Sequence, residues 1–309
     1  MEKREHFTNV AILTSGGDSP GMNSFIGHLI QIFETEKVNL FMIKDGFKGL
    51  TEGRIESWVN QKSVGDLIRE PGTILKSSRF PAFHDKEVRK KAIENLKERN
   101  ISTLITLGGE GTFQASKLIC HEGEIQVICI PATIDNNVFY SDYALGFDTC
   151  LTTISEAVDK IYWTARSHDR FMIVECMGNQ SGALTRYLAE SFGAKVYSTP
   201  ENYLSPAKLL NELHKHKEKK VMIIPITEKL YDSIVNLAAF LEKNLSREVR
   251  ATSLGHIQRG GLPSFYDRFI SRKLSRVAAD LITKESSSKL FTLKVEKEDK
   301  VKGIVVTKE

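Results

Sequence analysis

Several features are scarce in this chain of 309 residues, and each scarcity narrows what the protein can be. No apolar run approaches the roughly 20 residues of a membrane-spanning helix, so we expect no membrane segment. The first residues, Met1–His6, are charged and lack the apolar core of a signal peptide. The formal net charge is only +4, and the lysine-rich segment His214–Lys220 is typical of a solvated helix face. Composition therefore gives no reason to expect nucleic-acid binding.

Cysteine is also sparse. The four cysteines, Cys120, Cys129, Cys150 and Cys176, are scattered and show no metal-ligand spacing. We expect reduced thiols in the core of a cytoplasmic protein. The chain has no internal repeat and no low-complexity tract. Its composition, 41% apolar and 27% charged, is ordinary for a soluble globular protein and sufficient for one large domain or two smaller ones.

Apolar runs alternate with amphipathic stretches along the chain. The predicted strands are Val10–Leu13, Leu40–Ile43, Thr103–Thr106, Val127–Ile130, Phe171–Val174 and Val221–Ile224. The predicted helices are Asn23–Glu34, Lys86–Glu98, Thr112–His121, Thr149–Arg166, Gly182–Phe192, Pro206–Lys217, Tyr231–Asn244 and Tyr266–Thr283. This alternation indicates parallel sheets that helices cover on both faces. The strands form two sets, before and after about residue 147, which predicts an α/β fold of two lobes. The polar tail from Lys284 ends in short β-like runs such as Gly303–Thr307.

Two glycine-rich turns follow predicted strands. Thr14–Asn23 reads Thr-Ser-Gly-Gly-Asp-Ser-Pro-Gly-Met-Asn, and Leu107–Thr112 reads Leu-Gly-Gly-Glu-Gly-Thr. Glycine lets backbone N–H groups approach an anion, and the N-terminus of the following helix adds positive potential. The first turn is neither a Walker A loop nor a G-x-G-x-x-G motif, and alone it is compatible with an ordinary tight turn. Two such loops in one chain favour a phosphate site.

Two acids stand beside these loops. Glu110 lies among the glycines of the second turn, where a carboxylate could hold a Mg²⁺ ion that bridges substrate phosphates. The alternative is an acid that caps the following helix. Asp135 lies just past the predicted strand Val127–Ile130, at the edge where open α/β sheets bind ligands. It could accept the proton of an attacking hydroxyl in phosphoryl transfer, or it could be an ordinary turn aspartate.

Cationic side chains lie beside glycine, proline or strand boundaries. They are Arg79, Arg170, Arg250, His256 and Arg259. Arginine pairs with phosphate through a planar fork of donors, although a single arginine can equally serve a surface salt bridge. Together with the glycine-rich turns, these residues predict a site that holds phosphates and transfers one of them.

Taken in order, these segments resemble the phosphofructokinases, specifically the short bacterial-type ATP-dependent 6-phosphofructokinase family. The matching segments are Thr14–Asn23, Ser77–Pro81, Gly108–Gly111, Thr133–Asn136, Asp142–Thr149, Met177–Gly178 and Arg250–Arg268. The resemblance implies a phosphofructokinase-like α/β fold of two lobes, each a mostly parallel sheet flanked by helices. It implies a larger ATP-binding lobe over residues 1–146 and 259–309, and a smaller sugar-phosphate-binding lobe over 147–258.

The implied reaction is transfer of the ATP γ-phosphoryl group to the 1-hydroxyl of fructose 6-phosphate, with Mg²⁺, in cytoplasmic glycolysis. The implied assembly is a homo-oligomer, tetramer or dimer, whose sites are shared between subunits. No nucleic-acid or membrane partner is implied. Relatives that use pyrophosphate typically carry an Asp and a Lys where this chain has Gly111 and Ala132. These small residues leave room for the α-phosphate of a nucleotide, so ATP is the expected donor.

The resemblance also implies roles by position. The ATP-binding residues would be Gly17, Arg79, Phe80, Gly109, Glu110, Gly111 and Thr112, with Glu110 also the Mg²⁺ ligand. The catalytic base would be Asp135. Fructose 6-phosphate would contact Thr133, Ile134, Asp135, Met177, Gly178, Asn179, Glu228, His256, Ile257, Gln258 and Arg259. Arg170 and Arg250 fall on arginines that reach into the sugar-phosphate site of a neighbouring subunit.

Four positions depart from the family pattern. Glu110 replaces an Asp, Ala132 a Gly, Asn137 a second Asp, and Asn179 an Arg expected near the transferring phosphate. An amide cannot accept a proton as a carboxylate does, and the change at Asn179 removes a cation. These departures leave two further hypotheses open: a regulatory or catalytically weak subunit, and a kinase for another phosphosugar. The predicted helix around Ser24–Phe33 contains no arginine, which argues against classical ADP or phosphoenolpyruvate control.

Overall fold

The computed structural model describes residues 8–59, 63–284 and 289–306. The charged start, Met1–His6, and the serines Ser286–Ser288 of the polar tail lie outside the described residues. The chain forms two compact units. The larger lobe contains the described residues up to Thr133, then Asn137–Gly146 and the described residues from Leu262 on. The smaller lobe contains Ile134–Asn136 and Phe147–Gly261.

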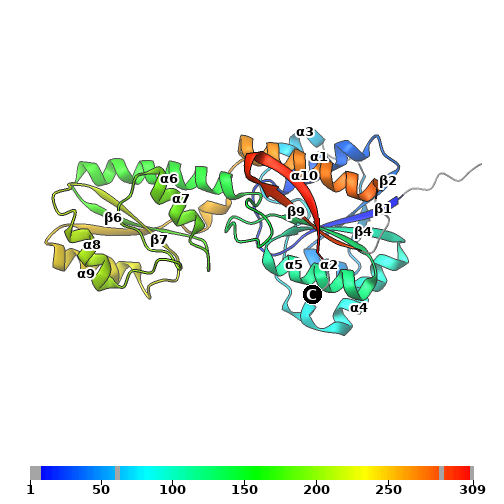
Figure 1. The fold of residues 1–309 in the computed structure, drawn as a ribbon, viewed down its shortest axis with the longest axis horizontal. Coiled ribbons are helices and arrows are strands. Elements are labelled where there is room, and N and C mark those ends of the chain that lie inside the picture. The colour runs from blue at the N-terminus through cyan, green and yellow to red at the C-terminus, as the bar shows by residue number, and fades with distance from the viewer. Residues whose placement is uncertain (1–7, 60–62, 285–288, 307–309) are drawn as a thin grey trace, which may run out of the picture. The chain divides into compact units, whose positions relative to one another are not determined.

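The larger lobe is built on a seven-stranded sheet. Its strands are β1 (Thr8–Thr14), β2 (Val38–Ile43), β3 (Ile55–Ser57), β4 (Ile101–Gly108), β5 (Gln126–Pro131), β9 (Leu290–Glu296) and β10 (Lys300–Val305). They lie in the order β10-β9-β5-β4-β1-β2-β3 (Figure 1). The five inner strands are parallel, whereas β3 and β10 are antiparallel edge strands.

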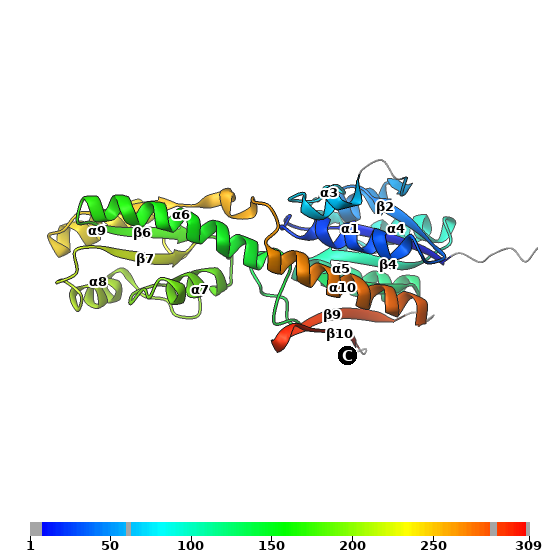
Figure 2. The same ribbon diagram turned by 90° about the horizontal axis from the view of Figure 1, so that it is seen from above.

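Helices cover both faces of this sheet (Figures 1 and 2). One face carries α1 (Met22–Phe33), α3 (Val64–Arg69) and α10 (Phe265–Lys284). The other carries α2 (Gly46–Thr51), α4 (Lys86–Glu98), α5 (Glu110–Gly123) and the 3₁₀ turn η1 (Pro81–His84). Successive strand residues point to opposite faces, so Ile12 is buried in one core cluster and Leu13 in the other. This is why the central strands are continuous apolar runs.

The smaller lobe has a three-stranded parallel sheet in the order β7-β6-β8, formed by β6 (Phe171–Cys176), β7 (Met222–Thr227) and β8 (Val249–Ser253). Helices α8 (Pro206–His214) and α9 (Ile234–Leu245) pack on one face. Helices α6 (Phe147–Ser167) and α7 (Ala183–Ser191) pack on the opposite face, where Thr227 Oγ1 bonds to Thr185 Oγ1 at 2.8 Å. The 3₁₀ turn η2 (Gly255–Arg259) follows β8.

The predicted fold class is confirmed, because each lobe has a mostly parallel sheet flanked by helices. Helix α5 begins at Glu110, two residues before the predicted start at Thr112. Helix α9 begins at Ile234 rather than Tyr231, since the Ser233 side chain accepts a hydrogen bond from Asn236 N and caps the helix there. The short elements α2, α3 and β3 and the strands β8 and β9 were not predicted. The assignment of ATP to one lobe and sugar phosphate to the other stays a prediction.

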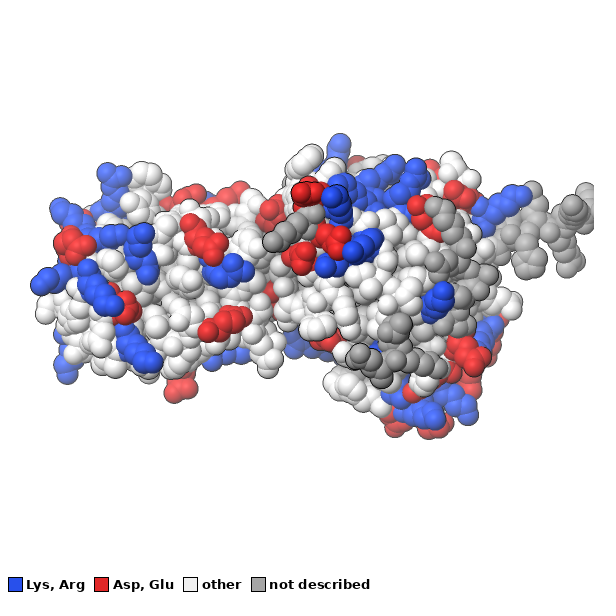
Figure 3. Space-filling model, viewed as in Figure 1, with Lys and Arg blue, Asp and Glu red and all other residues white. Residues whose placement is uncertain are grey.

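The surface carries charges of both signs. On the face drawn in Figure 3, the Lys and Arg side chains are interspersed with Asp and Glu on each lobe. Within the described ranges, every helix is too short or too polar to cross a lipid bilayer.

Candidate active site

The two glycine-rich turns lie side by side at the carboxyl edge of the larger sheet. Ser15 N donates to Leu107 O at 3.0 Å, and Thr112 Oγ1 donates to Ser15 O at 3.2 Å. A Cβ added to Gly108 would stand 2.2 Å from Thr112 Oγ1 and 2.6 Å from Ser15 O. Glycine is therefore required at position 108 for the turns to approach each other this closely.

The Ser77–Phe80 segment is hydrogen-bonded to the first of these turns. Gly16 has a left-handed φ of 85°, and its N–H donates to Ser78 O at 3.4 Å. Ser77 Oγ donates to Gly16 O at 2.7 Å. Arg79 is exposed, and Phe80 packs its ring 6.3 Å from that of Phe83. The predicted ATP-binding residues thus lie on three adjoining segments: Gly17, then Arg79 and Phe80, then Gly109, Glu110, Gly111 and Thr112.

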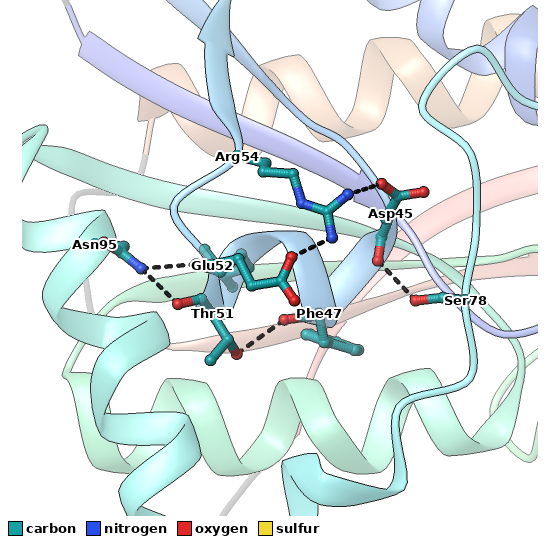
Figure 4. A network of polar contacts seen from close by, with 8 residues as sticks. Asp45, Phe47, Thr51, Glu52, Arg54, Ser78 and Asn95 are labelled. Atoms are coloured by element: carbon teal, nitrogen blue, oxygen red, sulfur yellow. Dashed lines mark hydrogen bonds and ion pairs between the residues drawn. The ribbon is translucent and has the colours of Figure 1, made fainter.

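A polar network holds this segment in place (Figure 4). Ser78 Oγ donates to the carbonyl oxygen of Asp45, at 2.8 Å, and Asp45 itself has a left-handed φ of 57°. The Arg54 guanidinium bonds to the carboxylates of both Asp45 and Glu52. Asn95 of α4 donates to two carbonyls at the end of α2, at 2.9 and 3.1 Å. The turn between β2 and α2 is therefore fixed from several sides, and it supports the segment that contains Arg79.

Helix α5 directs its N-terminus into the second glycine-rich turn, with Gly109 as the N-cap. Glu110 is half-buried in the first helical turn, and its Oε1 accepts a hydrogen bond from Gln114 Nε2 at 2.7 Å. The residues that the structure describes contain no group of three or more His, Cys, Asp or Glu that could hold a metal. A single carboxylate nevertheless suits Mg²⁺, which commonly takes its remaining ligands from substrate phosphates and water. The position of Glu110 fits both the metal and the capping hypothesis.

The loop that follows β5 lies beside the second glycine-rich turn. Thr133 touches Gly109, where an added Cβ would lie 3.5 Å from the Thr133 Cβ. Ile134 is fully buried, and the half-buried Asp135 follows it in a turn. Asn136 takes a left-handed φ of 46°. Asp135 therefore lies in a turn immediately after a buried parallel strand, as both hypotheses for this residue expect.

Cys129 is a buried neighbour of the glycine-rich turn and lines a small recess with Gly108, Gly109 and Thr112. Its Sγ accepts a hydrogen bond from Thr106 Oγ1 at 3.4 Å. Burial raises the pKa of the Cys129 thiol to about 11. A thiol that stays protonated is a poor nucleophile, so this cysteine contributes packing rather than covalent chemistry.

The smaller lobe gathers most of the predicted sugar-phosphate residues at the carboxyl edge of its sheet. Met177 N donates to Oε1 of the fully buried Gln258 at 3.0 Å, and Gln258 Nε2 donates to Gly255 O at 2.9 Å. These bonds tie the loop after β6 to the turn η2. Asn179 N donates to Glu228 Oε1 at 3.0 Å, which ties the same loop to the one after β7.

The η2 turn presents further predicted contacts. His256 is exposed, and Ile257, an apolar residue, has 57% of its surface exposed. Arg259 is half-buried at the end of the turn. Because Gln258 is anchored inside the lobe, its neighbours are held on the surface of the same edge. The loops after β6, β7 and β8 therefore form one cluster.

Arg170 and Arg250 lie at the other end of the strands. Arg170 precedes the six-residue strand β6, and Met177 follows it, so about 20 Å separates the two positions at roughly 3.3 Å per residue. Arg170 Nη2 lies 3.5 Å and Arg250 Nη2 lies 2.8 Å from Glu248 Oε1. The structure therefore does not bring these two arginines to the carboxyl edge of their own lobe.

Sequence reasoning missed Lys229, whose Nζ donates to Asn179 Oδ1 at 2.8 Å. Its position directly after Glu228, at the end of a strand, was the available signal. The network around Asp45 and Arg54 was also missed, because its members are spread over more than 30 residues of sequence with no motif.

A model of the family described as phosphofructokinase matches residues 9–282. The ATP-dependent 6-phosphofructokinase of Yersinia enterocolitica serotype O:8 / biotype 1B is 42% identical over 283 residues, which cover 91% of this chain and 85% of that protein.

The fold is similar to that of two solved structures. Phosphofructokinase from Saccharomyces cerevisiae superimposes with a TM-score of 0.87 at 24% identity, covering 96% of this chain but only 44% of the yeast chain. Pyrophosphate-dependent phosphofructokinase from Nitrosospira multiformis superimposes with a TM-score of 0.82 at 17% identity, covering 97% of this chain and 83% of that chain. At these identities the likeness concerns the fold alone, so it does not distinguish the phosphoryl donors.

Proposed function

Since the chain belongs to the phosphofructokinase family, we propose that it is an ATP-dependent 6-phosphofructokinase of cytoplasmic glycolysis. It transfers the γ-phosphoryl group of ATP to the 1-hydroxyl of fructose 6-phosphate and releases ADP and fructose 1,6-bisphosphate. The observation that carries this proposal is the 42% identity, over 91% of the chain, to an enzyme named for the same activity.

ATP binds along the three adjoining segments of the larger lobe. Backbone N–H groups of the two glycine-rich turns and the N-terminus of α5 face its phosphates, and Arg79 and Phe80 hold the nucleotide. A Cβ added to Gly111 would meet no atom within 4 Å, which supports room for a nucleotide there. Glu110 would hold Mg²⁺, which neutralises charge on the phosphates when it is bound.

Asp135 is the proposed base. A carboxylate close to the acceptor hydroxyl takes its proton as the bond to phosphorus forms, while the protein mainly positions the reactants and neutralises charge. Its place after β5 supports this role, because ligands of parallel α/β sheets bind outside the carboxyl ends of the strands. Thr133 and Ile134 of the same loop would contact the sugar phosphate.

The smaller lobe holds fructose 6-phosphate. Its proposed contacts are Met177, Gly178, Asn179, Glu228, His256, Ile257, Gln258 and Arg259. Arg170 and Arg250 serve the sugar-phosphate site of a neighbouring copy, and their location at the amino edge of the sheet supports this division. We therefore propose a homo-oligomer, a tetramer or a dimer. Exposed apolar side chains of this lobe, such as Trp163 at 59% exposure, suit burial against another copy.

The test is an assay of the purified protein with Mg²⁺, fructose 6-phosphate and either ATP or pyrophosphate, with fructose 1,6-bisphosphate identified by ³¹P NMR. We expect turnover with ATP, with kcat of about 1–100 s⁻¹ as in other kinases, and none with pyrophosphate. Asn137→Asp, which restores a second carboxylate, tests whether the amide limits the rate. Absence of turnover with ATP, together with thermal stabilisation by fructose 6-phosphate, would instead identify a regulatory subunit.

Subunit sharing has its own test. Neither Asp135→Ala nor Arg250→Ser should be active alone, but hybrids formed by mixing and reassembling the two variants should regain part of the activity. This follows because some sites then combine an intact base from one copy with an intact arginine from another. Mixtures that stay inactive after confirmed subunit exchange would contradict shared sites.

A further inference from the structure

A lysine and an asparagine on adjacent loops meet at the carboxyl edge of the smaller lobe's sheet. Lys229 Nζ donates to Asn179 Oδ1 at 2.8 Å. The Asn179 backbone N–H in turn donates to Glu228 Oε1 at 3.0 Å. Glu228 N donates to Cys176 O at 2.7 Å, which pins the loop after β7 to the end of β6. The two loops thus form one unit that fixes where the Lys229 ammonium lies.

Both contacting residues have left-handed backbones. Asn179 has φ 55° and Lys229 has φ 65°. Asparagine tolerates this conformation because its short polar side chain can hydrogen-bond locally, whereas lysine adopts it only at a cost in free energy. Glycine would occupy position 229 without that cost. Residues held in such conformations concentrate at ligand sites, where the surrounding structure compensates for the strain.

The charge of Lys229 is not neutralised by a neighbouring acid. Lys229 is exposed and takes no part in any ion pair among the described residues; its hydrogen-bond partner is a neutral amide. The nearest carboxylate in sequence, Glu228, accepts instead from the Asn179 N–H. An exposed ammonium fixed by an amide oxygen keeps donors for an incoming anion.

The backbone around Asn179 is tightly folded. Gly178, next to Asn179, has φ 143°, and a Cβ there would lie 2.2 Å from Ser181 O. The buried Gln258 holds the preceding residue, Met177, through its backbone N–H. Lys229 thus places a cationic side chain among the two loops that carry three of the proposed sugar-phosphate contacts, Met177, Gly178 and Glu228.

We propose that Lys229 binds a phosphate group of the sugar-phosphate substrate, and that Asn179 is a positioning residue that holds the Lys229 ammonium toward it. This inference rests on the proposed function, because fructose 6-phosphate is the phosphate-bearing ligand assigned to this lobe. The interaction is a charge-assisted hydrogen bond between an ammonium and a phosphate oxygen, and it contributes to binding in the ground state and the transition state alike.

The experiment compares Lys229→Met and Lys229→Arg with the wild type and with Lys208→Met. Lys208 is an exposed lysine in the first turn of α8 in the same lobe, so its variant removes an equal charge elsewhere. The readouts are kcat, KM for each substrate, and the Kd of fructose 6-phosphate from thermal shifts. Loss of one charge-assisted hydrogen bond should raise KM and Kd for fructose 6-phosphate about tenfold or more. We expect kcat and KM for ATP to change less than about threefold.

Arginine at position 229 should restore most of the affinity, and Lys208→Met should behave as the wild type. Lys229→Gly separates binding from folding, since it should lose affinity while its Tm stays level or rises through relief of the left-handed strain. Asn179→Gly keeps the backbone conformation and removes the amide oxygen. It should raise KM for fructose 6-phosphate a few-fold, and Lys229→Met should cost less in that background than in the wild type.

Wild-type kinetics in Lys229→Met, or equal losses in Lys229→Met and Lys208→Met, would overturn the role of Lys229 while leaving the proposed function intact. Wild-type behaviour of Asn179→Gly would overturn the positioning role. A wild-type protein that neither turns over nor is stabilised by fructose 6-phosphate would overturn the proposed function, and this inference with it.

Discussion

The buried side chain of Arg89 joins three elements of the larger lobe through four hydrogen bonds, so removing it should lower the free energy of unfolding. The residue is 6% exposed. Its Nε and Nη2 donate to both oxygens of Glu122, at 2.9 and 2.6 Å. Its Nη1 donates to the carbonyls of Phe83 and His84, at 3.0 and 2.7 Å. Arg89 thus ties α4 to α5 and to the turn η1, which directly follows Phe80.

Arg89→Met leaves the partly buried Glu122 carboxylate without its guanidinium partner. Breaking a buried ion pair by removing one partner costs about 3–5 kcal/mol of the free energy of unfolding. At about 2–4 °C per kcal/mol for a unit of this size, Tm should fall by about 6–20 °C. Arg89→Met combined with Glu122→Leu should lose much less than the two single variants together, because the double variant buries no unpaired charge.

The assay is urea unfolding and calorimetry, with Lys215→Met as the control. Lys215 and Glu212 form an exposed pair one turn apart, and such pairs contribute less than about 0.5 kcal/mol. Because two of the lost bonds fix η1, Arg89→Met should also raise KM for ATP while leaving KM for fructose 6-phosphate nearly unchanged. A loss below about 1 kcal/mol, close to that of the control, would refute the reasoning.

Three further expectations follow from the larger and smaller lobes. The hydrogen bond from the Arg89 guanidinium lowers the pKa of Glu122. The contribution of this ion pair to stability should therefore be complete above the ordinary glutamate pKa of about 4.3. It should disappear as the pH falls through the lower pKa that Glu122 has in the folded state. Urea curves of wild type and Glu122→Gln should therefore converge at low pH, and a constant difference would contradict this. Gly108→Ala places a Cβ 2.2 Å from a threonine hydroxyl, so it should destabilise by about 1–3 kcal/mol and raise KM for ATP. In thermal unfolding, Gly111→Ala, with no atom within 4 Å of the added Cβ, should not show this loss. Burial raises the pKa of Cys129 to about 11 and of Cys176 to about 12, so both thiols should resist iodoacetamide at pH 8 until the protein unfolds, and rapid native labelling would be contrary evidence.

Much of the fold could be predicted because its signals are local. β5 is buried along its whole length, so it stands out as an apolar run. Helix α4 has the predicted bounds, since Asp85 caps it through Glu87 N and apolar residues line one face. β8 escaped prediction because Arg250 and Thr252 interrupt its apolar pattern. Pairing with β6 stabilises this segment, and the local pattern of apolar residues does not predict pairing between segments that are distant in sequence.

Some residues of the candidate site could likewise be predicted from local sequence, and others could not. Glycine-rich turns and the acid after β5 could be found because they follow apolar strands in the sequence. The contact between Lys229 and Asn179 joins residues 50 positions apart. It depends on β6 and β7 being neighbours in the sheet and on the left-handed backbone of Lys229, and local sequence signals neither of these. The location of Arg170 at the amino edge likewise required the strand direction.

The central claim, that this chain is an ATP-dependent 6-phosphofructokinase with Asp135 as its base, is tested most directly by one comparison of kcat. Wild type and Asp135→Asn are assayed with saturating Mg²⁺-ATP and fructose 6-phosphate, after thermal shifts establish that both bind the sugar phosphate. Loss of a general base should lower kcat by about 10²–10⁴-fold with little change in fructose 6-phosphate binding. A wild-type protein that forms no fructose 1,6-bisphosphate, or an Asp135→Asn variant that retains the wild-type kcat, would contradict the account.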